Sequence, residues 1–161
     1  MAMAEECEDV WFNGEPNLFY TDTDSMHITT QLLKHLEEKY ENQYHEPLKG
    51  RYLGNCHEDF DPPENFKPGE YVLGACESYF LMKKVYVDKL IGSQGSIGYH
   101  IRMKGIPTNL VHFEDYEKIF NGENVEFDLL NGHTRFYYKD GHVGSRLEFK
   151  RKIGLKRKNN E

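Results

Sequence analysis

Residues 18–28 read LFYTDTDSMHI, and this stretch decides the fold. Apolar and polar residues alternate on both sides of its centre, which predicts two short strands joined by a turn over residues 21–24. Although successive side chains of a strand point to opposite faces, a tight turn can bring Asp22 and Asp24 together at the hairpin tip. Two carboxylates held that close repel each other, and a hard divalent cation such as Mg²⁺ relieves the repulsion. The stretch therefore predicts a metal-binding hairpin.

A solvated turn is the alternative interpretation, because Asp is a favoured turn residue. For an isolated Asp-x-Asp pair that plain interpretation is favoured. The longer string YTDTDS, from Tyr20 to Ser25, is far more specific when strands flank it. It resembles motif C of family B DNA polymerases, the hairpin that carries metal ligands of the palm domain, and Thr23 lies between its two aspartates. Thr21 departs from the family pattern, in which Gly or Cys is common at this position.

Composition indicates a folded domain. The chain has 161 residues, of which 38% are hydrophobic and 14% aromatic, which argues against disorder. No apolar run approaches the ~20 residues that a membrane-spanning helix needs, so no membrane partner is expected. Residues 1–9 lack the basic and apolar regions of a signal peptide. The three cysteines, Cys7, Cys56 and Cys76, have no metal-binding spacing, which favours reduced thiols in an intracellular protein.

The charge is unevenly distributed along the chain. The net charge of −7 divides into 5 Lys and Arg against 17 Asp and Glu over residues 1–80, and 15 against 10 over residues 81–161. This asymmetry indicates an acidic half that holds metal and a basic half that faces phosphates, although two solvated faces of opposite bias would look the same.

Beyond the hairpin the chain predicts one helix and then a sheet. Thr29 or Thr30 can cap a helix, because apolar residues then recur at helical spacing. Paired prolines make residues 59–64 a surface loop. Strand patterns follow over residues 71–80, 82–91 and 97–103. With a Gly/Ser-rich turn over residues 92–96, they predict an antiparallel meander.

Lys84 and Tyr86 are predicted to share one face of the second of these strands. A cation and a phenol placed in this way can bind a phosphate and pack on a sugar, although for this short pattern alone an ordinary strand surface is the favoured explanation. Family B polymerases carry a Lys-x-Tyr motif after motif C that holds the primer terminus, and Lys84 and Tyr86 match its position. The segment KGIP, beginning at Lys104, is similar to one that leads into the thumb in the protein-primed branch. That likeness implies that Lys104 lies near the primer or template backbone.

The remaining residues predict a helix followed by strands. Residues 113–120 have the pattern of a short amphipathic helix with a terminating Asn121-Gly122. Strand patterns follow over residues 125–130, 134–138 and 143–153. The C-terminal part carries a basic strip that either contacts phosphates or is simply solvated, and no individual contact is assigned to it. Its members are Arg146, Lys150, Arg151, Lys152, Lys156, Arg157 and Lys158.

The predicted fold class is α+β, with an antiparallel palm-type sheet and few helices followed by a small helix-plus-hairpin thumb. The expected segments are an acidic lead-in over residues 1–16, the C-terminal part of a palm over 17–107, a thumb over 108–153 and a basic tail over 154–161.

The resemblance implies a DNA-directed DNA polymerase, a nucleotidyltransferase that uses two Mg²⁺ ions, for which Mn²⁺ can substitute. Asp22 and Asp24 would be the catalytic metal ligands, and Lys84, Tyr86 and Lys104 would bind the primer strand. The implied partners are a DNA primer-template and deoxynucleoside triphosphates, with a terminal priming protein in the branch of viruses, linear plasmids and mobile elements. The expected location is intracellular, at the site where such DNA is replicated.

The same family has further motifs upstream: a palm aspartate, a nucleotide-binding fingers motif and usually an exonuclease. These cannot fit in the 17 residues before Leu18. We therefore expect a C-terminal segment that needs a separate N-terminal polymerase segment and is inactive alone.

Two other classes of protein remain as alternatives. A non-catalytic DNA-binding remnant or accessory module would use the basic half and keep a vestigial aspartate pair, which would bind no Mg²⁺ or Mn²⁺. A phosphatase of the haloacid-dehalogenase type also has an apolar strand that ends in Asp-Thr-Asp-Ser. That fold needs alternating strands and helices, whereas this sequence predicts a meander.

Overall fold

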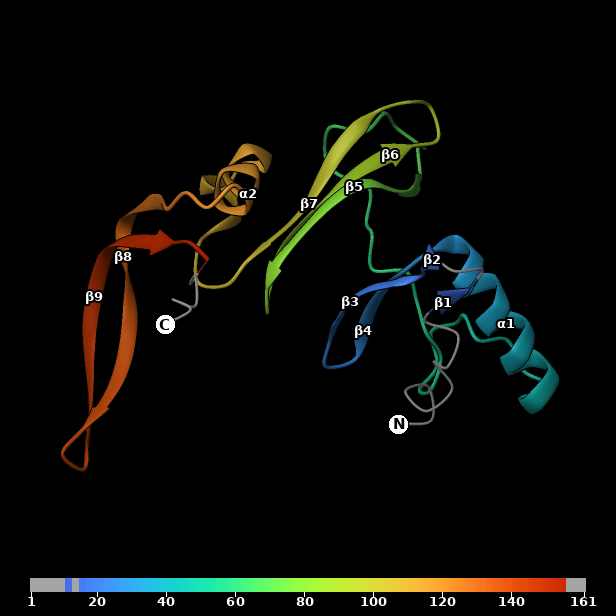
Figure 1. Cartoon of the computed structure of the whole chain (residues 1–161), viewed down its shortest axis with the longest axis horizontal. Coiled ribbons are helices and arrows are strands. Elements are labelled where there is room, and N and C mark those ends of the chain that lie inside the picture. The colour runs from blue at the N-terminus through green and yellow to red at the C-terminus, as the bar shows by residue number, and fades with distance from the viewer. Residues whose placement is uncertain (1–10, 13–14, 156–161) are drawn as a thin grey trace. The chain divides into compact units, whose positions relative to one another are not determined.

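The computed structural model describes residues 11–12 and 15–155, which form two compact units that divide between Asp61 and Pro62. Figure 1 labels the elements of both units. The described residues contain two α-helices, and all pairs of named strands are antiparallel. The predicted α+β class with antiparallel sheets and few helices is therefore confirmed. No helix in this described part is long and apolar enough to cross a membrane.

The described part of the first unit starts with two short antiparallel strand pairs. Their strands are β1 (Trp11–Phe12), β2 (Glu15–Pro16), β3 (Leu18–Asp22) and β4 (Ser25–Ile28). β1 pairs with β2 and β3 pairs with β4. Because Asp22 lies opposite Ser25, the β3–β4 turn consists of Thr23 and Asp24 alone. The predicted hairpin is confirmed, with a shorter turn than expected because Thr21 and Asp22 still pair in the ladder.

Helix α1 (Thr30–Tyr44) follows the hairpin and starts where the sequence predicts. The Thr29 hydroxyl oxygen accepts a hydrogen bond from the Leu32 N–H at 3.1 Å, so Thr29 is the N-cap. The same hydroxyl donates to the side-chain oxygen of Asn17 at 2.6 Å. The buried leucines of α1 pack with Leu48 beyond the helix, and together they form the core of this unit.

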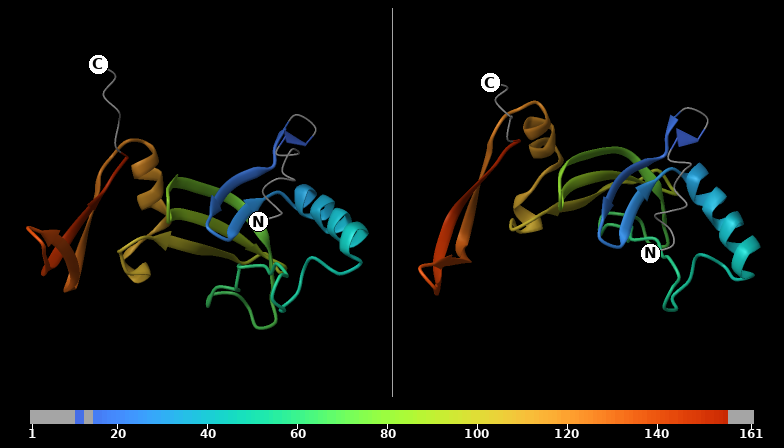
Figure 2. Two further views of the ribbon diagram at one scale, coloured as in Figure 1. Left: turned by 90° about the horizontal axis from the view of Figure 1, so that it is seen from below. Right: turned by 60° about the horizontal axis from the view of Figure 1, so that its bottom comes forward.

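A meander, one α-helix and a long hairpin make up the second unit. The elements are β5 (Val72–Met82), β6 (Val85–Gly92), β7 (Ile97–Met103), the 3₁₀-helix η3 (Thr108–Leu110), α2 (Phe113–Phe120), β8 (Val125–Lys139) and β9 (His142–Ile153). β6 is the central strand of the sheet β5–β6–β7, whose strands lie side by side in green and yellow in Figure 2. The predicted meander and the predicted helix over 113–120 are confirmed.

The β5–β6 turn corrects one prediction. We predicted a strand over residues 82–91 that carries Lys84 and Tyr86 on one face. Instead β5 extends to Met82, Lys83 and Lys84 form the turn, and β6 begins directly after them. Lys84 has φ +61°, in the left-handed region, so it does not share a strand face with Tyr86. The pairing register of the two strands decides where the turn falls, and an alternating sequence does not reveal that register.

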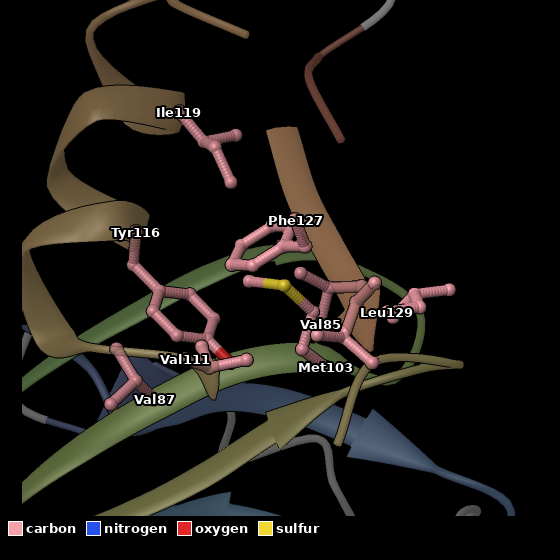
Figure 3. Packing of buried hydrophobic residues seen from close by; sticks show 9 residues of the cluster. Val85, Val87, Met103, Val111, Tyr116, Ile119, Phe127 and Leu129 are labelled. Carbon is pink, nitrogen blue, oxygen red and sulfur yellow. The ribbon is translucent and has the colours of Figure 1, made fainter. Parts of the chain in front are cut away.

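The core of the second unit lies between one face of the sheet, α2 and the β8–β9 hairpin (Figure 3). Its buried members are Val85, Val87, Met103, Ile106, Val111, Tyr116, Ile119, Phe127 and Leu129. Burial of this apolar surface drives the packing. The Tyr116 hydroxyl donates to the Arg102 carbonyl oxygen at 2.8 Å, which satisfies a polar group inside the core.

The buried carboxylate of Glu70 joins the loop before β5 to the β6–β7 turn. It accepts hydrogen bonds from the backbone N–H groups of Lys67 at 3.0 Å, Gln94 at 2.8 Å and Ser96 at 3.0 Å. Burial raises the pKa of Glu70, but the hydrogen bonds from Ser96, Lys67 and Gln94 outweigh it and lower the pKa to about 2. The charged carboxylate therefore stabilises this end of the sheet.

The β8–β9 hairpin differs from the sequence prediction in its continuity. We predicted separate strands over 125–130 and 134–138, whereas β8 is one strand whose pairing with β9 is irregular between Asp128 and His133. Gly132 lies in that interval with φ +65°, a conformation that lets the strand bulge and then resume pairing. The pair Asn131-Gly132 thus lies in a bulge within one continuous strand.

Cys56 and Cys76 carry free thiols. Cys7, most of the acidic lead-in and most of the basic tail lie outside the described residues.

Candidate functional site

The tip of the β3–β4 hairpin holds the predicted metal ligands. Asp22 ends β3 and is half-buried, whereas Asp24 lies in the turn and is exposed. The Asp24 N–H donates to the Asp22 carbonyl oxygen at 2.7 Å, which closes a three-residue turn around Thr23. The turn therefore holds the backbones of the two aspartates close together at the hairpin tip.

Thr23 is strained. Its φ is +59°, in the left-handed region, which is a rare conformation for a β-branched residue. Its hydroxyl donates to the Asp22 carboxylate at 3.2 Å, and the Ser25 hydroxyl donates to the Asp22 carbonyl oxygen at 3.1 Å. Thr23 thus contacts the Asp22 carboxylate, and Ser25 contacts the Asp22 backbone. Strain of this kind persists where the surrounding contacts over-determine the backbone, and it is common at functional sites.

The chemistry of this tip suits a hard cation. Two carboxylates, completed by water and substrate phosphates, are a usual ligand set for Mg²⁺. Within residues 11–12 and 15–155 there is no group of three or more His, Cys, Asp or Glu side chains that could hold a metal ion. Asp22 and Asp24 remain the candidate ligands, and their donor atoms fit Mg²⁺ or Mn²⁺.

Tyr20, the first motif residue, supports the hairpin from the side. Its ring meets the His27 ring edge-on with centroids 5.6 Å apart, and these two residues are partners in the β3–β4 ladder. His27 in turn meets the Phe60 ring edge-on at 6.0 Å. Such cross-strand aromatic pairs stabilise a two-stranded ribbon.

Lys84 and Lys104 come together at one end of the second unit's sheet. The Lys104 N–H donates to the Lys84 carbonyl oxygen at 2.9 Å, so the turn after β7 lies against the β5–β6 turn. Both side chains are exposed, as is that of Lys83. Three ammonium groups from two adjoining turns make a surface that can attract phosphates. We call Lys83, Lys84 and Lys104 the lysine cluster.

Tyr86 lies apart from this surface. It is 7% exposed, on the central strand, with its ring centroid 6.1 Å from that of Phe80 and 5.8 Å from that of His100. Of the three predicted primer-binding residues, the structure joins the two lysines and places the tyrosine within the sheet.

Besides Glu70, the structure shows polar contacts of Asp88 and of Arg151 that were not predicted from the sequence. On the same face of β6 as Tyr86, the fully buried Asp88 accepts a hydrogen bond from the Ser78 hydroxyl at 2.7 Å, and its carboxylate lies 3.1 Å from His100 Nδ1. Asp88 thus has a polar partner on each of the two strands that flank β6. Side chains alternate between the two faces along β6, so the sequence can place Asp88 on the same face as Tyr86. It cannot reveal the partners Ser78 and His100, because they come from β5 and β7.

The other unpredicted residue is Arg151 on β9. Its guanidinium donates to the Gly105 carbonyl oxygen at 2.8 Å, across 46 residues of sequence. The basic strip that contains Arg151 was recognised, but nothing in it distinguishes this arginine from its neighbours.

Comparison of the chain with family models, with curated proteins and with solved structures gave no match.

Proposed function

We propose that the chain is the metal-binding and primer-binding part of a DNA polymerase that resembles family B, in its protein-primed branch. The observation that carries the proposal is the hairpin tip, where Asp22 and Asp24 flank a strained Thr23 whose hydroxyl donates to the Asp22 carboxylate. A plain solvated turn has no need of a left-handed threonine between two carboxylates, because Gly or Asn adopts that conformation at lower cost.

The catalytic role is assigned to the two aspartates. Bound Mg²⁺ ions would supply Lewis-acid stabilisation of the attacking 3′-oxygen and of the leaving pyrophosphate. Asp22 and Asp24 would hold these ions, and the donation from Thr23 would keep the Asp22 carboxylate oriented toward them. By resemblance Asp24 is the more critical of the two.

The lysine cluster is assigned to the primer-template. Lys84 and Lys104 would contact its phosphates, and exposed lysines of this kind act as point charges that position a nucleic acid without reading its sequence. Tyr86 would support the β5–β6 turn from within the sheet, a role that fits its burial better than direct contact with a sugar.

The proposed partners are a DNA primer-template, deoxynucleoside triphosphates, a separate N-terminal polymerase segment and, for protein priming, a terminal protein. Alone, the 161-residue chain should incorporate no nucleotide, because its motifs do not include the family's second palm aspartate or fingers lysine. Incorporation that the purified chain catalyses by itself would contradict this.

Mn²⁺ titration followed by nuclear magnetic resonance tests the metal assignment. Mn²⁺ should broaden the backbone amide signals of Thr23 and Asp24 first, and excess Mg²⁺ should reverse the effect. Asp24→Asn should abolish the selective broadening. Asp140→Asn is the matched control, because Asp140 is also an exposed aspartate in a hairpin turn, at φ +52°. Broadening that is no stronger at Thr23 than at Asp140, or that survives Asp24→Asn, would refute the assignment.

A non-catalytic DNA-binding module is the second candidate. It is favoured by one observation: the lysine cluster is formed within the second unit, by the β5–β6 turn and the turn after β7. DNA binding in the presence of EDTA, together with no Mn²⁺ binding at Asp24, would select this candidate over the polymerase segment.

A further inference from the structure

Arg151 joins β9 to the turn that carries Lys104. Its Nη1 donates to the Gly105 carbonyl oxygen at 2.8 Å, and the arginine is only partly buried. β9 holds Arg151 in place through its pairing with Phe127, a member of the core. The contact therefore links the packed part of the hairpin directly to the turn.

The turn has a defined geometry. The Ile106 N–H donates to the Met103 carbonyl oxygen at 3.0 Å, and Gly105 has φ +80° at the third position, as in a type II turn. A side chain at Gly105 would be strained by that φ and would collide with the Arg151 guanidinium. The contact with the Arg151 guanidinium therefore requires glycine at position 105.

Lys104, at the second position of the turn, is held through its backbone on both sides. Its N–H donates to the Lys84 carbonyl oxygen, and the carbonyl of the next residue accepts from Arg151. Its side chain remains exposed. The backbone is fixed and only the four-carbon side chain has to be ordered when a phosphate binds, which lowers the entropic cost of binding.

We propose that Arg151 is a positioning residue for nucleic-acid phosphate binding: through Gly105 it fixes the turn that presents Lys104 beside Lys84. This inference rests on the proposed function, because it deepens the assignment of the lysine cluster to a nucleic acid. It also makes the cluster depend on the β8–β9 hairpin, which supplies the arginine.

A double-mutant cycle tests whether Arg151 acts through Lys104. Binding of the full chain to a fluorescent primer-template is measured in EDTA over a series of salt concentrations for the wild type, Arg151→Met, Lys104→Gln and the double variant. Lys104→Gln should weaken binding about threefold at low salt and reduce the slope of log K against log[salt] by about one. Arg151→Met should weaken binding and reduce the salt slope by similar amounts when Lys104 is present. In the Lys104→Gln background it should cause almost no further loss of affinity.

Arg135→Met is the matched control, since it removes an exposed arginine from the same hairpin that is ion-paired with Glu148 at 3.1 Å. Any effect it has should be equal in the two Lys104 backgrounds. Arg151→Lys, which keeps a donor, should bind with intermediate affinity. If circular dichroism shows that Arg151→Met does not fold, Arg151→Lys replaces it in the double-mutant cycle.

Equal effects of Arg151→Met with and without Lys104 would mean that the arginine contacts DNA itself, and would overturn the proposal. So would an Arg151→Met affinity equal to that of the wild type, or no binding by the wild type in EDTA. Because EDTA removes divalent ions, these outcomes are independent of the Mn²⁺ titration at Asp24, which tests the proposed function separately.

Discussion

The backbone N–H of Lys104 donates to the carbonyl oxygen of Lys84 at 2.9 Å, so two lysines from separate turns share one end of the sheet. Lys84 reaches this position only through a left-handed backbone, with φ +61°. A residue other than glycine in this conformation costs roughly 1–2 kcal/mol. The strained backbone of Lys84 therefore places it in the lysine cluster and also lowers the stability of the fold.

Lys84→Gly should separate stability from nucleic-acid binding. Glycine adopts the left-handed conformation without strain but loses more entropy on folding, so the free energy of unfolding should stay the same or rise by up to about 1 kcal/mol. Binding to primer-template should weaken, because an ammonium group is lost. Thermal unfolding and fluorescence anisotropy measure the two effects.

Lys83→Gly is the control for this prediction. It removes the same charge from the same turn at a residue that does not need a positive φ, so it should lower the free energy of unfolding by roughly 0.5–1 kcal/mol. If both glycine variants change stability alike, the strain assigned to Lys84 is absent.

Thr23→Gly should relax the aspartate hairpin. The β-branched residue at φ +59° is replaced by one that tolerates the conformation, so the first unit should become more stable by about 1 kcal/mol. Mn²⁺ affinity should fall, because the hydroxyl that donates to Asp22 is lost and the turn becomes more mobile. Chemical denaturation and Mn²⁺ titration are the measurements.

Thr21→Gly serves as the comparison for Thr23, because Thr21 pairs within the ladder and is exposed. Glycine in a strand interior should destabilise the hairpin. A Thr23→Gly variant that is less stable than the wild type, or that binds Mn²⁺ equally well, would remove the link between strain and metal binding.

Glu70→Gln should make the free energy of unfolding depend less on pH in the acid range. The folded-state pKa of Glu70, about 2, lies below its ordinary value of 4.5, so the stabilisation is complete above pH 4.5 and is lost as the pH falls toward 2. The glutamine variant should be less stable than the wild type at pH 7, and the difference should shrink over that window.

Urea denaturation at a series of pH values measures the Glu70 effect. Glu64→Gln removes an exposed carboxylate from the same loop and leaves the three N–H donors of Glu70 untouched, so it serves as the control. A Glu70→Gln difference that stays constant between pH 7 and pH 2 would show that the carboxylate is not held in its charged form.

Tyr116 and Ile119 test the core of the second unit, in which both are fully buried. Tyr116→Phe removes only the hydrogen bond to the Arg102 carbonyl and should cost about 1 kcal/mol. Ile119→Ala leaves a cavity and should cost about 2–5 kcal/mol. Equal losses for the two variants in urea denaturation would mean that the core does not pack as described.

Much of the fold was predictable from local pattern. Thr29 caps α1 because its hydroxyl accepts a hydrogen bond from an N–H group less than one turn further along the chain. Helix α2 has the predicted bounds because its apolar residues recur at helical spacing. The turn of the β5–β6 hairpin was not predictable in the same way, since every residue from Met82 to Val85 is compatible with an alternating strand. Pairing with the neighbouring strand decides where such a run reverses.

In the candidate site, too, local contacts were predictable from the sequence and long-range contacts were not. The sequence alone determined that the backbones of Asp22 and Asp24 lie close together, because one tight turn contains Asp24 and follows Asp22 directly. Tertiary structure alone decided that Lys104 adjoins Lys84, that Tyr86 lies within the sheet, and that Arg151 donates to Gly105. These contacts join segments far apart in the chain, and they depend on how the elements pack. No local pattern records such packing.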